Sequence, residues 1–375
     1  MQLCSILIAV FVFSCTLLFA QMNKEKINQE WKTDITNKSV PLNEFTALLK
    51  RDGIPPIDNP KFWNKKQGDK VFFKHEPVIA VAINGKAKAY PLSILMWHEI
   101  VNDRIGGVPI SATYCPLCNA AIVFDRKLNF KGKEYLLDFG VSGMLRKSDM
   151  VMWDRQTETW WQQFMGEGLV GELKGAQLNV LPSMLISYEE FFRSYPDGLV
   201  LSTETGHNKE YGKNPYVNYD DLSNEKPRFF KGRVDPRLPA MERVININVK
   251  GIDRIYPLSV IQKKKVINDS PHNEPIVLFY QKGTVSVIDK NDIKSSKDIG
   301  AVTVFVPIVK NKRLTFMPGD KGFIDKETNS VWNITGRCIE GKYKGEQLEP
   351  VVHGNHFAFA WFAFKPDCEV YSIED

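Results

Sequence analysis

Two cysteines separated by two residues, Cys115 and Cys118, have the residue type and spacing that point most clearly to chemistry. They follow a run of apolar and β-branched residues that predicts a strand, so both thiols should lie at a strand end. Such a pair can exchange electrons with another dithiol, hold one soft metal ion such as Cu(I) or zinc, or form a structural disulfide. In the redox interpretation Cys115 is the attacking thiolate and Cys118 the resolving thiol, and in the metal interpretation both are ligands. The spacing leaves these interpretations open.

His98 is the nearest imidazole upstream of the pair, on a helix predicted over residues 92–101. An imidazole beside a thiol lowers the thiol pKa or completes a metal site, so His98 is predicted as a catalytic partner and a third metal ligand. The alternative is a partly buried histidine that bonds Asn102 or a backbone carbonyl.

A second group of residues is predicted to bind a ligand. Small residues around Ser142 allow a close approach of the backbone to a bound molecule. The alternative is a set of ion pairs that holds the loops together. The predicted ligand-binding residues are Asp125, Arg126, Ser142, Asp149 and Arg155.

Four further residues near the C-terminus are predicted to be structural. His353 and His356 have no carboxylate at the spacing that a zinc protease requires. Cys338 and Cys368 could form a disulfide after export to an oxidising compartment, because the four cysteines of the mature chain divide into two pairs.

Repeated segments indicate how the chain is organised. The pattern of Val78–Leu95 recurs as Val244–Ile261, and Asp154 and Trp161 recur as Asp325 and Trp332. Strand patterns with Asn-Gly or Lys-Gly turns predominate, and helices are interspersed without βαβ alternation. The fold class is therefore predicted as α+β and strand-rich, with two tandem copies of one repeat unit packed together.

The repeat sets the predicted domain boundaries. An N-terminal lead-in covers 21–76, the first repeat 77–205, a linker 206–240 and a degenerate second repeat 241–375. Gln281 and Thr284 occupy the positions of the cysteine pair in the second repeat. Because only the first repeat keeps the thiols, we interpret them as a functional site and not as scaffold.

Composition and absent motifs exclude several classes of protein. The formal net charge is +5, from 49 Lys+Arg and 44 Asp+Glu, which is too weak to indicate a nucleic-acid partner. No phosphate-binding loop, dinucleotide fingerprint, serine-hydrolase elbow or zinc-protease motif occurs in the sequence.

The N-terminus predicts export. Residues 1–20 carry no charge, and their apolar stretch 6–13 is typical of a signal peptide and shorter than a spanning helix. The signal could be cleaved before Gln21, or Cys15 could be lipidated and tether the protein to a membrane. An uncleaved anchor is the third alternative. The predicted location is therefore periplasmic, or membrane-anchored as a lipoprotein.

Five segments carry distinctive motifs: 90–93, 97–103, 113–118, 124–126 and 139–143. Together they resemble a bacterial and archaeal family, domain of unknown function 3179 (DUF3179). The resemblance runs over most of the mature chain and implies an exported or membrane-associated protein, without implying a particular activity. Cys338 and Cys368 lie outside the family pattern.

The predicted function is thiol redox chemistry or binding of copper or zinc at Cys115 and Cys118. Redox chemistry through the thiols alone would need no cofactor. The alternative is a non-catalytic binding or scaffold protein outside the cytoplasm, in which the pair is a structural disulfide. Whether the protein is an enzyme, and what its partner is, stay open at this level.

Overall fold

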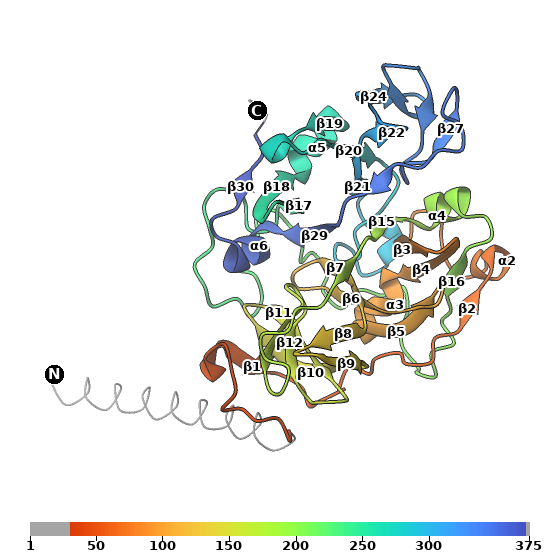
Figure 1. Ribbon diagram of the computed structural model, residues 1–375. Coiled ribbons are helices and arrows are strands. Elements are labelled where there is room, and N and C mark those ends of the chain that lie inside the picture. Colours follow the sequence, from red (N-terminus) through yellow and green to blue (C-terminus); the bar gives the residue numbers. More distant parts are fainter. Residues whose placement is uncertain (1–30, 373–375) are drawn as a thin grey trace, which may run out of the picture.

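The computed structural model describes residues 31–372, in which strands predominate over short helices (Figure 1). Helices account for 12% and strands for 41%, which confirms the predicted strand-rich α+β class. The α-helices are α2 (Lys65–Gly68), α3 (Leu92–His98), α4 (Tyr188–Ser194), α5 (Leu258–Lys264) and α6 (Ala358–Phe364), and the 3-10 helices are η1 (Leu42–Glu44), η2 (Pro271–Asn273) and η3 (Ile293–Ser295).

The largest sheet combines strands from both predicted repeats. Strands on its two sides meet where β15 pairs with β21 at Leu185 and Val302. In spatial order the strands are β19 (Val266–Asp269), β20 (Ile276–Gln281), β21 (Ala301–Val306), β15 (Met184–Ser187), β3 (Pro77–Ile83), β4 (Lys86–Pro91), β16 (Leu199–Leu201) and β2 (Phe62–Trp63), and β28 (Glu349–Pro350) also pairs with β21.

Two sheets carry the residues of the candidate site. The first has the order β14 (Val180–Leu181), β7 (Ala120–Asp125), β6 (Val108–Cys115) and β5 (Ile100–Ile105). The second has the order β1 (Phe45–Ala47), β10 (Phe139–Arg146), β11 (Asp149–Asp154), β12 (Trp160–Gln162) and β13 (Glu167–Val170). Both are antiparallel, and short turns connect β6 to β7 and β10 to β11.

The remaining strands form four smaller sheets. Strand β29 packs beside β7, and the Phe357 amide donates a hydrogen bond of 2.9 Å to the Cys118 carbonyl. The sheets are β29 (His353–Phe357), β17 (Arg243–Val249), β18 (Ile252–Pro257) and β30 (Glu369–Val370); β24 (Phe316–Gly319), β25 (Gly322–Asp325), β26 (Val331–Trp332) and β27 (Cys338–Glu340); β22 (Ile308–Val309) and β23 (Lys312–Arg313); and β8 (Lys127–Phe130) and β9 (Lys133–Leu136).

The same side-chain contacts occur at two places in the chain. The Tyr90 hydroxyl donates to Asp103 at 2.7 Å, and the Tyr256 hydroxyl donates to Asp269 at 2.7 Å. Each tyrosine ends a strand that leads through a proline into a seven-residue helix. One hydrogen-bonded arrangement therefore fixes the hairpin, the helix and the following strand in both segments.

One helix is shorter than the sequence predicts. The helix expected over residues 92–101 ends at His98, because Glu99 adopts a φ of 58° and the chain enters β5 at Ile100. A positive φ in a residue with a Cβ is uncommon and breaks the helical repeat. This turn changes the direction in which the side chains of His98 and Glu99 point.

The segment 206–240, predicted as a linker, contains neither helix nor strand. Tyr219 is nevertheless part of the main core and only 3% exposed, and Tyr211, Tyr216 and Phe230 pack against that core. The predicted signal peptide and Cys15 lie outside the described residues. Between residues 31 and 372, no helix combines the length and the apolar character needed to cross a membrane.

Candidate metal centre

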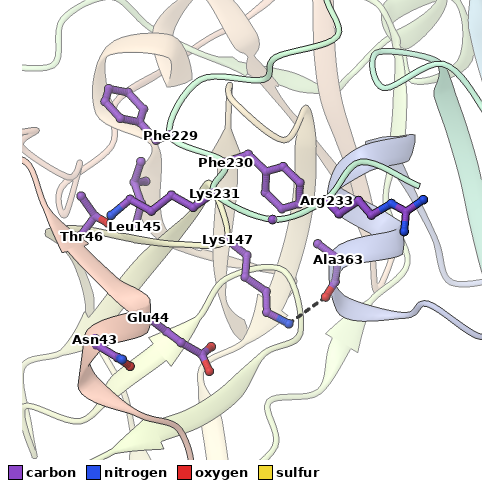
Figure 2. A pocket seen from close by; sticks show the side chains of 11 residues that line it. Asn43, Glu44, Thr46, Leu145, Lys147, Phe229, Phe230, Lys231, Arg233 and Ala363 are labelled. Atoms are coloured by element: carbon purple, nitrogen blue, oxygen red, sulfur yellow. Dashed lines mark hydrogen bonds between the residues drawn. The ribbon is translucent and has the colours of Figure 1, made fainter. Parts of the chain in front are cut away.

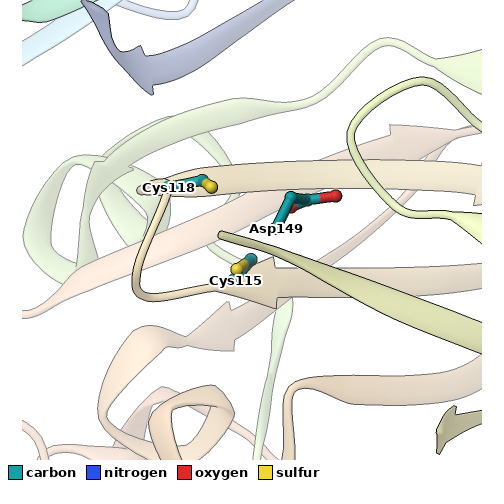
Figure 3. A group of neighbouring side chains, drawn as sticks. All are labelled: Cys115, Cys118 and Asp149. Carbon is teal, nitrogen blue, oxygen red and sulfur yellow. The ribbon is translucent and has the colours of Figure 1, made fainter. Parts of the chain in front are cut away.

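The cysteine pair lies at the turn between β6 and β7. Cys115 is the last residue of β6, and four turn residues lead into β7, with Asn119 at a φ of 53°. The turn places both thiols at one end of the sheet, as the sequence predicts (Figure 3). Both thiols are free, so the expectation of a structural disulfide between them is wrong for this structure.

Asp149 completes a three-residue cluster with Cys115 and Cys118. Its carboxylate and the two Sγ atoms all lie within 4.8 Å of one another (Figure 3). The exposed fractions are 1% for Cys115, 0% for Cys118 and 0% for Asp149. Asp149 Oδ2 accepts hydrogen bonds from Gln162 Nε2 at 2.5 Å and the Phe164 amide at 2.9 Å, which fixes the carboxylate. Asp149 Oδ1 has no nitrogen or oxygen donor within residues 31–372, so this oxygen is available to a ligand beside the sulfurs.

Burial changes the protonation of every acidic group in this region. It raises the pKa of both thiols, and it raises the pKa of Asp149 to about 7. Glu99 is a fourth acid nearby, and burial together with the Asp149 charge raises its pKa to about 8. Withdrawing an acid from water disfavours its anionic form. Without a cation, both thiols are therefore protonated near neutral pH and Asp149 is about half protonated.

His98 does not join the cluster, contrary to the prediction. Its Nδ1 bonds the Pro55 carbonyl at 2.7 Å, and its Nε2 bonds the Tyr211 hydroxyl at 2.7 Å. Both ring nitrogens are therefore occupied, as in the structural alternative, although with other partners than Asn102. Burial also lowers the pKa of His98 to about 4, so the ring is neutral. His98 lies away from the cysteines because α3 ends at this residue, and the turn that follows directs Glu99 toward them.

The segment 206–240 covers the cysteine turn, which the sequence did not reveal. The Tyr219 hydroxyl donates to the Leu117 carbonyl at 3.1 Å, between the two cysteines. The Ser148 hydroxyl, next to Asp149, donates to the Arg228 carbonyl at 2.7 Å. The aromatic residues of this segment are the only feature of the sequence that indicates that it packs against the rest of the protein.

The other predicted ligand-binding residues have partners within the chain. Arg126 pairs with Asp138 and donates to the Leu137 carbonyl at 3.1 Å. Arg155 pairs with Asp58 at 2.8 Å. These contacts hold loops together, as the ion-pair alternative supposes, and outside the three-residue cluster a role in ligand binding stays a prediction.

Asp125 and Ser142 also bond neighbouring backbone. Asp125 accepts from the Lys127 amide at 2.8 Å, which shapes the turn into β8. The Ser142 hydroxyl donates to the Val151 carbonyl at 2.5 Å across an irregular part of the β10–β11 pair.

The C-terminal histidines and cysteines lie in structural contacts. His353 bonds the Val351 carbonyl at 2.7 Å, and His356 bonds Asn246 at 2.9 Å. Cys338 and Cys368 are both free, so the expected second disulfide is absent from the described chain. The Cys338 thiol instead donates to the Glu340 carbonyl at 3.3 Å.

The corresponding place in the second half has different chemistry. The Tyr280 amide bonds the Lys265 carbonyl at 2.9 Å, as the Tyr114 amide bonds the Glu99 carbonyl at 2.8 Å. Lys265 lines a pocket of about 770 Å³ that contains neither thiol nor glutamate. The replacements are Lys265 for Glu99, Gln281 for Cys115 and Thr284 for Cys118.

Fold and site together define a strand-rich α+β protein with a buried dithiol–carboxylate cluster. The chain belongs to the family described as protein of unknown function, DUF3179, whose model matches residues 51–368. This range includes all three cluster residues and confirms the family predicted from the sequence. No curated protein and no solved structure matches the chain.

Proposed function

We propose that this protein binds one metal ion through the sulfurs of Cys115 and Cys118 and the carboxylate of Asp149. The observation that carries the proposal is the approach of three buried ligand atoms to within 4.8 Å of one another. Buried acidic groups are costly unless a cation compensates their charge. A bound metal would keep both thiols and Asp149 deprotonated and recover that cost.

Zinc fits this donor set better than Cu(I). Zinc binds thiolates and carboxylates together, whereas Cu(I) favours sulfur ligands alone. A divalent ion also compensates more of the charge of two thiolates and one carboxylate. The fourth ligand would be Glu99 or a water molecule. Glu99 is a candidate because the charge of Asp149 raises the pKa of the Glu99 carboxyl group.

Burial argues against thiol exchange as the main activity. An attacking thiolate must reach the disulfide of its partner, and neither sulfur is exposed. The raised pKa of both thiols also lowers the fraction of thiolate. Thiol exchange is therefore the alternative that the binding experiment described next must distinguish from metal binding.

The experiment measures zinc content and Co²⁺ binding of the purified full-length protein. Wild type should bind about one equivalent and show a thiolate-to-cobalt absorption band. The Cys115→Ser/Cys118→Ser variant should lose both. The matched control is Cys338→Ser/Cys368→Ser, which removes two buried free cysteines outside the cluster and should bind as wild type does.

Other results would contradict the metal site. A wild type that binds neither zinc, Co²⁺ nor Cu(I) but exchanges with a dithiol would support the redox function. If it does neither, and the Cys115→Ser/Cys118→Ser variant melts much lower than the control, the pair has a structural role.

We also infer that the protein is exported. The support is the uncharged apolar segment at residues 1–20, together with a family resemblance that implies an extracytoplasmic location. A metal bound at Cys115 and Cys118 would protect the two thiols from oxidation in such a compartment.

Finally, we infer that segments 77–205 and 241–375 are two copies of one repeat unit. Matching hydrogen bonds at Tyr90 and Tyr256 support this inference. Superposition of the two segments in an experimentally determined structure tests it, and different local topologies around the two tyrosines would contradict it.

A further inference from the structure

A pocket of about 460 Å³ lies beside the turn that leads into Asp149 (Figure 2). Four separate parts of the chain line it: the η1 segment, the β10–β11 turn, residues 229–233 and the end of α6. Figure 2 shows residues 229–233 passing across the pocket, with the η1 segment on one side and α6 on the other. This volume is in the range of small-molecule sites.

The pocket combines cations with apolar surface. Lys147 and Lys231 line it, and Arg233 lies at its edge. The one acidic group among the lining residues, Glu44, already pairs with Arg146 at 2.7 Å. The positive charge of the lysines is therefore only weakly compensated by the pocket itself.

Aromatic and aliphatic side chains supply the apolar part. Phe229 is 48% exposed, which is unusual for a phenylalanine, and Phe230 and Leu145 line the same pocket. Exposed apolar surface rimmed by charged groups is typical of a ligand site.

Lys147 is held in place by the backbone around it. It has a φ of 53°, and its Nζ donates to the Ala363 carbonyl at 2.8 Å. An ammonium group has three donors, so two remain for a ligand.

We propose that this pocket binds a small organic anion, with its charged group on Lys147 and its apolar body on Phe229 and Phe230. The ligand class is a phosphate or carboxylate attached to a ring or short alkyl group. This proposal does not depend on metal binding.

The pocket and the metal centre share one turn. Ser148 follows Lys147, has a φ of 72°, and is the residue before Asp149. The Cys115 thiol, which belongs to the metal centre, lies 4.0 Å from the Ser148 carbonyl. A ligand on Lys147 would therefore bind to the same β10–β11 turn that positions Asp149.

Calorimetry on the full-length protein tests the proposal with phenyl phosphate as the probe. Inorganic phosphate tests the charge alone, and phenol tests the apolar body alone. Phenyl phosphate should bind saturably and more tightly than either. Lys147→Met should weaken its binding about tenfold, the size expected for one charge-assisted hydrogen bond.

The matched control is Lys131→Met. Lys131 also lies in a hairpin turn at a positive φ, 51°, but outside the pocket, so its loss should leave binding unchanged. Phe229→Ala, at an exposed position, should weaken phenyl phosphate and leave inorganic phosphate unaffected. The Cys115→Ser/Cys118→Ser variant should bind phenyl phosphate as wild type does, which separates this test from the test of the metal centre.

Three results would overturn the proposal. One is the absence of saturable binding of phenyl phosphate. Another is equal weakening by Lys147→Met and Lys131→Met, which would indicate only a general effect of charge. The third is binding to vesicles of anionic phospholipid without binding of phenyl phosphate, which would assign the surface to a membrane.

Discussion

Asp149 is the residue that changes the interpretation of the cysteine pair. Two thiols three positions apart are compatible with several chemistries, but a fixed buried carboxylate beside them favours a metal ion. The carboxylate is held through Oδ2 by Gln162 and Phe164, and Oδ1 has no nitrogen or oxygen donor within residues 31–372. Rigid placement of this kind is what a metal site requires.

Asp149→Asn should lower the affinity for zinc by about a hundredfold, because the neutral amide replaces an anionic ligand. Competition titration with a zinc chelator measures the change. Asp125→Asn, at the end of β7 and outside the cluster, is the control and should bind as wild type does. Equal affinities of Asp149→Asn and wild type would show that the carboxylate is not a ligand.

The metal-free protein should become less stable as the pH rises from about 7 to about 9, above the range in which the buried, neutral His98 and His356 make stability increase with pH. Burial raises the pKa of Asp149 to about 7 and that of Glu99 to about 8, so the folded chain retains protons that the unfolded chain has released. Raising the pH then favours the unfolded state. Thermal melting in the presence of a chelator measures this trend.

Added zinc should oppose this loss most strongly at high pH, where its ligands lose protons more easily. Asp149→Asn and Glu99→Gln should each flatten the pH dependence of the metal-free protein. A melting temperature that rises over the same pH range would contradict the assignment of these two carboxyls.

Among the secondary-structure elements, two short turns position the residues of the site. The β6–β7 turn presents both thiols, and the β10–β11 turn presents Asp149 from another sheet.

Two turns outside the site are held by buried aspartates. Asp154 accepts from the Thr157 amide at 2.6 Å and from Trp161 Nε1 at 2.8 Å. Asp325 accepts from the Thr328 amide at 2.6 Å and from Trp332 Nε1 at 2.9 Å.

Asp154→Ala and Asp325→Ala should each destabilise the fold by about 2–4 kcal/mol, because each leaves buried donors without an acceptor. Urea unfolding of the metal-free protein measures both values. Asp221→Ala, an exposed turn residue, is the control and should cost much less. A large cost in one half and none in the other would contradict a common structural role for the two turns.

At the scale of the whole molecule, the two halves are joined through shared sheets and through the segment 206–240. Strand β29 of the second half lies beside β7, and Tyr219 bonds the backbone between the cysteines. The site therefore depends on the complete chain, although its three residues all lie before residue 150. A chain truncated before residue 240 should not form it.

Export should be visible as processing of the N-terminus. Mass spectrometry of the protein from its native source should detect a chain that begins at Gln21 or a lipid-modified Cys15, because the segment 1–20 is typical of a signal peptide. Intact Met1 on a cytoplasmic protein would contradict export.

The sequence by itself determined those features that depend on local spacing. The distance between Cys115 and Cys118 is limited by three residues of chain, so a strand and a turn suffice to bring the thiols together. Alternating apolar residues and turn signals likewise predicted an α+β fold, since they reflect the pleat of individual strands. The family, too, could be recognised from contiguous motifs.

Only the tertiary structure decided which distant side chains reach the thiols. Asp149 belongs to another sheet, and no periodic pattern relates it to Cys115. His98 and Glu99 are adjacent in the sequence, yet the positive φ at Glu99 sends them to different surroundings. Side-chain direction at the end of a helix depends on how the chain packs, which short-range spacing does not encode.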